Sequence, residues 1–137
     1  MRAVVVRVSR ASLTADGESR GEMGKGLLVL LGVGGEDTRR EATYLAEKCA
    51  ALRIFEDENG KMNKSLADIG GSMMVVSNFT LYADCSRGRR PDFFHAAKPD
   101  VAIPLYEFFI SEIERLQVPC ITGVYGADMK IDHVNDG

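Results

Sequence analysis

The sequence predicts a single α+β domain in which a curled, antiparallel, barrel-like β-sheet carries two main helices. Three observations predict this fold class. Strand-like segments outnumber helical ones, hairpin turns imply antiparallel pairing, and two stretches repeat apolar residues at helical spacing. The length of 137 residues suits one domain, so residues 1–137 are taken as a single unit.

Three strands are predicted at the start of the chain. Residues 2–9 place valines at alternate positions, the period-two pattern of a pleated strand. Asp16-Gly17 predicts a type I′ hairpin turn, because both central positions of that turn need positive φ, and a second strand follows at residues 18–23. Residues 25–31 hold an uninterrupted run of leucine and valine, which is typical of a strand buried on both faces.

Two helices and several shorter elements complete the predicted fold. The first helix begins near Asp37 or Thr38, and the second covers residues 100–117, where Pro104 fits only in the first turn. Residues 84–91 are polar and rich in arginine, which predicts a loop. The shorter elements are strands and one turn, at residues 53–55, 59–60, 73–76, 121–125 and 128–134.

Composition narrows the classes of function. A net charge of −3 does not suggest a general polyanion binder, so any contact with nucleic acid is expected to be local. No apolar run is long enough to span a membrane and no leader precedes the first strand, which predicts a cytoplasmic protein. The three cysteines and two histidines are scattered, so we expect no disulfide framework, metal or other cofactor. A histidine-based metal site or a Ser-His-Asp triad would need residues that converge from far apart in the chain.

Two polar segments admit a functional or a structural interpretation. Gly32-Val33-Gly34-Gly35 lies between a strand and a helix, where phosphate-binding loops occur, but it lacks their full motif and an ordinary turn is favoured. The basic segment Arg87-Gly88-Arg89-Arg90, with Lys98 nearby, either neutralises phosphates or forms a solvated loop, and the sequence favours neither. Phe93 and Phe94 could stack on a base, although packing onto the core is the favoured role.

The most informative segment is Ser77-Asn78-Phe79-Thr80, at the end of the second buried strand. Backbone N–H groups freed at a strand end can form an oxyanion hole, and the two hydroxyl groups can orient an ester or water. Taken alone, however, the segment is better explained as a polar strand end that satisfies local backbone hydrogen bonds.

A functional role for this segment is supported by a second motif, Asn135-Asp136-Gly137, and by other stretches along the whole chain. Ser77-Asn78-Phe79-Thr80 matches a Ser-Gln-x-Thr motif, and Asn135-Asp136-Gly137 matches the first three residues of Asn-x-Gly-Pro-Val/Phe-Thr. In these motifs the sequence resembles the D-aminoacyl-tRNA deacylase family. The matching stretches keep the family's order and spacing, at residues 7–12, 26–33, 53–55, 60–63, 75–81, 90–91, 127–129 and 134–137.

The resemblance implies a reaction and a set of site residues. It implies that a homodimer, with active sites at the subunit interface, hydrolyses the ester bond of D-aminoacyl-tRNA and of mischarged glycyl-tRNA. Ser77, Phe79 and Thr80 would be the catalytic residues, with backbone groups around Phe79 and Thr80 facing the oxyanion. Because no activating base lies beside Thr80, we expect the terminal 2′-hydroxyl of the tRNA to assist water. The other predicted residues bind substrate (Asn78, Arg7, Met129, Asn135 and Gly137) or contact tRNA (Arg87, Arg89 and Arg90).

The resemblance also implies how D-amino acids are selected. The Gly-Pro pair of the second motif would be a cis peptide that enters the partner's site and occupies the space of an L side chain. Glycine has no side chain to exclude, so glycyl-tRNA would also be hydrolysed. Arg7 matches the position that braces this pair. The expected partners are aminoacyl-tRNA and a second copy of the chain, and neither DNA nor a membrane.

Two departures from the family pattern qualify this prediction. Asn78 replaces the usual Gln, which shortens the side chain by about 1.5 Å. The chain stops at Gly137, so the proline is missing, and we expect a polypeptide truncated there to have lost its chiral filter. Two alternatives therefore stay open: a tRNA-binding module with impaired turnover, and a general esterase for small amino-acid esters, which is least favoured because no activated nucleophile is visible.

Overall fold

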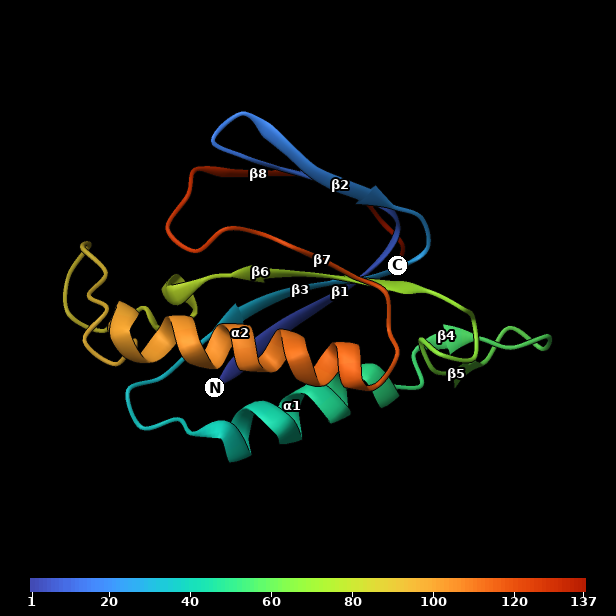
Figure 1. Cartoon of the computed structure of the whole chain (residues 1–137), viewed down its shortest axis with the longest axis horizontal. Helices are drawn as coiled ribbons and strands as arrows, with labels where there is room; N and C mark the ends of the chain where they lie inside the picture. The colour runs from blue at the N-terminus through green and yellow to red at the C-terminus, as the bar shows by residue number, and fades with distance from the viewer.

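The long strand β1 (Arg2–Ala15) is the centre of the sheet, and the computed structural model describes all of residues 1–137. β2 (Glu18–Met23) and β3 (Gly26–Gly32) both pair antiparallel with β1, and β8 (Met129–Asn135) pairs with its second half. β1 runs well beyond the predicted residue 9 because a bulge near Arg10, where the register with β8 shifts, bends the strand and lets it continue. The bend gives the sheet its curl (Figure 1).

The predicted α+β class is confirmed, but pairing is not antiparallel throughout. β6 (Ser72–Ser77) lies between β3 and β7 (Cys120–Thr122) and runs parallel to both, so the sheet is mixed. Parallel neighbours need a crossover connection. The helix α1 (Arg39–Ala51) lies in the connection from β3 to β6, and α2 (Pro99–Arg115) lies in the connection from β6 to β7.

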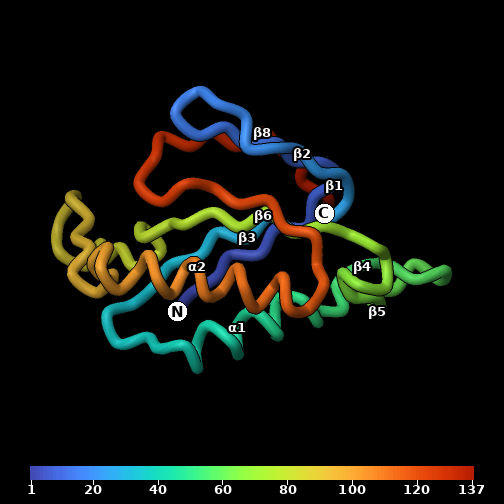
Figure 2. The backbone as a smooth tube through the Cα atoms, viewed as in Figure 1, coloured from blue at the N-terminus to red at the C-terminus, as the bar shows by residue number.

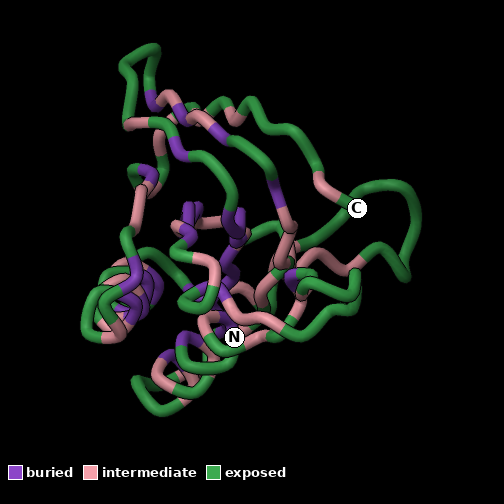
Figure 3. The backbone as a smooth tube through the Cα atoms, turned by 90° about the vertical axis from the view of Figure 1, so that its right-hand side faces the viewer, coloured by how far each residue is buried: buried purple, intermediate pink, exposed green.

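Both helices pack on one face of the sheet, and the other face curls over a second core (Figures 1 and 2). Because successive side chains of a strand point to opposite faces, Leu27 and Val29 of β3 pack under the helices while Leu28 packs inside the curl. This explains why the strand is a continuous apolar run. Figure 3 shows buried positions in the centre of the sheet and on the inner sides of the helices.

The start of α1 is capped in the ordinary way, whereas α2 has a proline inside it. Thr38 caps α1: its side chain accepts from the Arg40 N–H, and its own N–H donates to the Glu41 carboxylate at 2.8 Å. The prediction that Pro104 lies in the first turn of the second helix is wrong, because α2 already begins at Pro99. The missing N–H of Pro104 removes one bond to the Asp100 carbonyl, near the solvated start of the helix.

The shorter elements match the predictions with shifted limits. Asp16 and Gly17 form the hairpin turn with φ of 50° and 82°. The predicted strand at residues 53–55 is β4 (Phe55–Glu56), which pairs with β5 (Met62–Lys64) around the predicted turn. The 3-10 helix η1 (Phe79–Tyr82) follows β6. β7 ends earlier than predicted because the chain turns at residues 123–128, before β8.

Candidate active site

The predicted catalytic segment lies where β6 ends and η1 begins. The chain passes from half-buried to exposed positions across Ser77-Asn78-Phe79-Thr80. The Asn78 N–H donates to the Leu31 carbonyl at 2.8 Å, which ties the end of β6 to β3. The segment therefore reaches the surface while its backbone is held by the sheet beneath it.

The side chain of Asn78 holds the following residues in place. Its Oδ1 accepts from the Thr80 N–H at 3.2 Å and from the Thr80 hydroxyl. Asparagine is well suited to bond its own backbone two residues on. The residue that replaces the family's Gln therefore acts within its own segment. Because an amide oxygen is not a base, the Thr80 hydroxyl has no neighbour here that would activate it as a nucleophile.

The backbone N–H groups of η1 are the candidate donors for an oxyanion. The first N–H groups of a helix have no partner within it. Asn78 Oδ1 already accepts from the Thr80 N–H. Of the two backbone positions that the resemblance implies, Phe79 is therefore the one whose N–H is free to face an oxyanion.

A pocket of about 420 Å³ opens beside this segment. The structure brings Met129 next to Ser77 and Phe79, which joins three predicted residues that are distant in sequence. Sequence reasoning missed most of the rest of the lining, because alanine, proline and glycine carry no chemical signal by themselves and Tyr125 lies in a turn that only the fold brings to the pocket. The matching stretch at residues 127–129 was the only sequence feature that pointed to this turn. The lining residues are Ser77, Phe79, Ala97, Pro99, Tyr125, Gly126, Ala127 and Met129.

Buried Tyr106 of α2 supports the floor of the site. Its hydroxyl donates to the Val75 carbonyl of β6 at 2.8 Å, and its ring centroid lies 6.4 Å from that of Tyr125. Burial raises the pKa of Tyr106 well above its ordinary value, so the phenol stays a protonated donor. Tyr106 thus fixes the end of β6 relative to the turn that closes the pocket.

The second motif lies elsewhere, beside Arg7. The Arg7 guanidinium donates from Nε to the Asp136 carbonyl at 2.7 Å and from Nη1 to the Ile54 carbonyl at 2.7 Å. The Asn135 side chain donates to the Gly137 carbonyl at 2.6 Å. Gly137 has a φ of 102°, and a Cβ there would lie 2.6 Å from Arg7 Nη2, so glycine suits this contact. Arg7 thus holds residues 135–137, called the C-terminal segment below.

The pocket and the C-terminal segment are far apart within one chain. Met129 stands at the start of β8 beside the pocket, and Asn135 stands at its end. At about 3.3 Å per residue, this strand separates the two by about 20 Å. Figure 1 shows the C terminus well separated from the end of β6 that leads into η1. One copy of the chain therefore does not bring the two motifs together.

The predicted arginine-rich loop lies next to the pocket. Two backbone hydrogen bonds of 2.9 and 3.0 Å between Asp84 and Asp92 join its ends. The Phe93 ring that follows packs edge-to-face on the Phe79 ring, with centroids 5.0 Å apart, and so connects the loop to the pocket. Three exposed side chains of the loop take part in none of the chain's ion pairs: Arg87, Arg89 and Arg90.

The glycine-rich segment is a structural turn. The Gly34 N–H that a phosphate would need already donates to the Asp37 carboxylate at 2.6 Å. A Cβ at Gly34 would lie 2.8 Å from the Tyr82 hydroxyl, and one at Gly32 would lie 3.3 Å from the same ring. These glycines therefore make room for Tyr82 of η1. Burial, followed by the charge of Asp37, raises the pKa of Tyr82.

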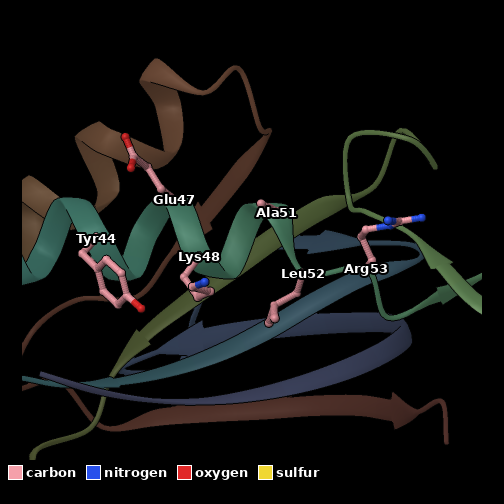
Figure 4. A pocket seen from close by; sticks show the side chains of 6 residues that line it. All are labelled: Tyr44, Glu47, Lys48, Ala51, Leu52 and Arg53. Atoms are coloured by element: carbon pink, nitrogen blue, oxygen red, sulfur yellow. The ribbon is translucent and has the colours of Figure 1, made fainter.

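Another pocket, of about 410 Å³, lies on the outer surface of α1 and includes none of the predicted site residues. Figure 4 shows that its lining comes from α1 and the residues just after it, between Tyr44 and Arg53. The Lys48 ammonium lies 5.6 Å from the centroid of the Tyr44 ring. Because no polar groups converge on it from a second element, this pocket offers no chemical site.

In the helices of the structure, no segment is both long and apolar enough to cross a bilayer.

Comparison with solved structures defines the class of fold. A structure described as "Structural Analysis of a probable eukaryotic D-amino acid tRNA deacylase" matches with a TM-score of 0.83 at 14% identity, and 98% of this chain and 94% of that one are covered. At such low identity the match shows the fold alone. A structure described as "c-Myc DNA Unwinding Element Binding Protein" matches with a TM-score of 0.90 at 37% identity, and 100% of this chain and 93% of that one are covered.

Sequence comparison then identifies the family. The family model described as "D-Tyr-tRNA(Tyr) deacylase" matches residues 4–137. A D-aminoacyl-tRNA deacylase of Koribacter versatilis is 56% identical over the whole chain, which covers 92% of that protein. One of Thermus aquaticus is 54% identical, again over the whole chain and over 90% of the relative. The chain belongs to the D-aminoacyl-tRNA deacylase family, a family of hydrolases.

Proposed function

We propose that the chain hydrolyses the ester bond that joins a D-amino acid to the terminal adenosine of a tRNA. The observation that carries this proposal is the pocket at the end of β6, where Ser77, Phe79 and Met129 meet in a chain of this family. The products are the free D-amino acid and a tRNA with its 3′-hydroxyl restored. Such a reaction keeps D-amino acids out of translation.

The side chains around the ester favour a role in positioning. Water attacks the ester carbonyl, the Phe79 N–H faces the oxygen that becomes negative, and the 3′-oxygen leaves with a proton. The Thr80 hydroxyl donates a hydrogen bond to Asn78 Oδ1, and an amide oxygen does not deprotonate it, so Thr80 is not activated as a nucleophile. The neighbouring 2′-hydroxyl of the substrate lies close enough to the ester to orient the water and to relay its proton: it accepts the proton of the attacking water and passes its own hydroxyl proton to the leaving 3′-oxygen. The protein then supplies orientation and a fixed oxyanion donor.

The pocket is suited to the terminal adenosine. Its volume of about 420 Å³ lies within the usual range for small-molecule sites. The Tyr125 and Phe79 rings and the Met129 thioether offer flat or polarisable surface on which a base can stack. With the base held there, the ester at the 3′-oxygen faces the exposed end of the strand.

Selection of the D form requires a second copy of the chain. Within one copy the C-terminal segment does not reach Phe79 and Thr80, because it lies at the far end of β8. In a symmetric dimer, the segment held by Arg7 of each copy would enter the pocket of the other and occupy the space of an L side chain. A glycyl ester would pass this filter because it has no side chain. The active unit is therefore a homodimer with shared sites.

Release of free amino acid from charged tRNA tests the function. D-tyrosyl-tRNA should be hydrolysed much faster than a simple ester such as D-tyrosine methyl ester, and much faster than L-tyrosyl-tRNA when the proline that follows the glycine of the second motif is present. Binding of the tRNA without release of D-tyrosine would leave only a binding module, and equal turnover of the simple ester would indicate a general esterase. A single-stranded DNA competitor should not inhibit, whereas strong inhibition would give this chain the DNA binding after which the 37% identical structure is named.

Charge removal from the arginine loop should weaken the salt dependence of the reaction. Changing Arg87, Arg89 and Arg90 to Gln removes exposed, unpaired charges beside the pocket. We expect a higher KM for charged tRNA, and a salt slope of log(kcat/KM) reduced by about 0.7–0.9 for each phosphate that no longer meets an arginine. Arg40→Gln, an exposed arginine of α1, is the matched control and should change neither. An unchanged slope in the triple variant would exclude these arginines from the RNA interface.

A further inference from the structure

A second, larger cavity lies further along η1 than the adenosine pocket. Its volume is about 720 Å³. Phe79, at the start of η1, lines the first pocket, and Tyr82, at its end, lines the second. At about 2 Å per residue, this 3-10 helix separates the two residues by about 6 Å along its axis. A single sugar–phosphate unit can cover such a span.

The second cavity carries an exposed aromatic group that the fold does not need. Phe94 is 87% exposed, and its ring meets only the neighbouring His95 ring edge-on, with centroids 5.6 Å apart. The backbone beneath it is fixed, because the Gly35 N–H donates to the His95 carbonyl at 3.3 Å. The exposed face of this ring is therefore open for a nucleic-acid base to stack on.

The same cavity carries one cation without an acidic partner. The Arg2 guanidinium stacks over the Tyr82 ring at 4.4 Å and donates from Nη1 to the Leu81 carbonyl at 2.9 Å. Of the two carboxylates of the cavity, Asp37 is engaged by the N-terminal ammonium and the Gly34 N–H, and Glu36 lies exposed. Arg2 forms no ion pair with either, so its remaining N–H groups are free for a phosphate.

We propose that this second cavity binds the nucleotide that precedes the terminal adenosine of the tRNA. The base stacks on Phe94, and Arg2 contacts the phosphate that links this nucleotide to the adenosine. The 3′ end of a charged tRNA is single-stranded, and proteins bind single strands by this combination of stacking and phosphate contact. The proposal rests on the proposed function, because the adenosine must occupy the first pocket.

Two substrates that differ only beyond the adenosine test this proposal. One is D-tyrosyl-tRNA, and the other is the D-tyrosyl ester of adenosine alone, which has nothing to place in the second cavity. We expect Phe94→Ala to lower kcat/KM for the tRNA by about 10- to 100-fold, the effect of removing one base–aromatic stack. The same variant should hydrolyse the adenosine ester at the wild-type rate, and Phe94→Trp should restore the activity on tRNA.

Matched controls make each outcome decisive. Tyr44→Ala removes another exposed aromatic ring, on α1, and should affect neither substrate. Equal losses on both substrates with Phe94→Ala, or no loss on tRNA, would overturn the second cavity as a nucleotide site. If the wild-type protein hydrolyses neither substrate, the proposed function fails. In that case the cavity is tested by binding alone. An uncharged RNA oligonucleotide that ends in cytidine–adenosine should bind more weakly to Phe94→Ala than to the wild type, and equal binding would overturn the cavity as a nucleotide site.

Discussion

Deacylation of a D-aminoacyl-tRNA whose terminal adenosine lacks the 2′-hydroxyl should be about 10²–10⁴-fold slower than deacylation of the ordinary substrate. That range is the usual contribution of a positioned general acid or base. The loss follows because the protein offers no side chain that could take over: the hydroxyl of Thr80 is bonded to Asn78 Oδ1, and no base lies beside it. Single-turnover release of D-tyrosine from tRNA ending in 3′-tyrosyl-2′-deoxyadenosine measures the effect.

The corresponding change in the protein, removal of the Thr80 hydroxyl, should have little effect on the rate of the chemical step. Thr80→Val keeps the shape of the side chain and removes its hydroxyl, so the rate of hydrolysis should stay within about tenfold of wild type if Thr80 only supports η1. The two hypotheses give opposite patterns. A nucleophilic Thr80 would make Thr80→Val inactive and would leave the 2′-deoxy substrate competent.

The second large effect concerns stability and begins at Gly26. A Cβ at this position would lie 2.0 Å from the Ser72 carbonyl oxygen, where β3 and β6 begin their parallel pairing. Neither backbone can yield without breaking the ladder that ends at Ser77. Gly26→Ala should therefore lower the free energy of unfolding by about 3 kcal/mol and the Tm by about 10 °C. Urea and thermal denaturation measure both quantities.

A neighbouring glycine supplies the control for this change. Gly24 has no atom within 4 Å of the position that a Cβ would take, and its φ is not positive. Gly24→Ala should therefore leave the unfolding free energy within about 0.5 kcal/mol of wild type, as surface changes usually do. Equal stability of the two variants would show that the contact between Gly26 and β6 is looser than the structure indicates.

Much of the fold could be predicted because local chemistry and global packing agree. The continuous apolar run of β3 indicated burial on both faces, and the Asp16-Gly17 turn has the positive φ values that its sequence predicts. The parallel pairing of β6 could not be predicted in this way. Local patterns identify a strand, whereas its neighbours depend on which connections pass over the sheet. The length of β1 was missed because a bulge interrupts its alternation.

Part of the candidate site could likewise be predicted from the sequence, and part could not. The polar residues at a buried strand end made Ser77-Asn78-Phe79-Thr80 noticeable, but only the resemblance favoured a catalytic role for this segment, and Met129 was named through the resemblance as well. Tyr125 was missed because its role depends on a turn that closes the pocket only in three dimensions. That Asn78 binds substrate stays a prediction, and the structure adds that its Oδ1 forms a local cap on Thr80. Side-chain type alone does not distinguish these roles.

The central claim is that two copies of the chain share each site, the pocket from one and the C-terminal segment from the other. Site-specific cross-linking tests it most directly. One tagged copy carries Ala127→Cys in the pocket lining and the other carries Asn135→Cys, both with the exposed Cys85 changed to Ser. Burial raises the pKa of the Cys49 thiol to about 11 and that of Cys120 to about 12, so the remaining thiols are poor nucleophiles.

Treatment of the mixed copies with a short bismaleimide should yield a covalent dimer of twice the 15.0 kDa chain mass that carries both tags. The cross-link should form because the C-terminal segment of one copy enters the pocket of the other. A single chain that carries both cysteines should not cross-link internally, since β8 holds the two positions about 20 Å apart. An internal cross-link, or a dimer whose copies fail to cross-link, would contradict the shared site.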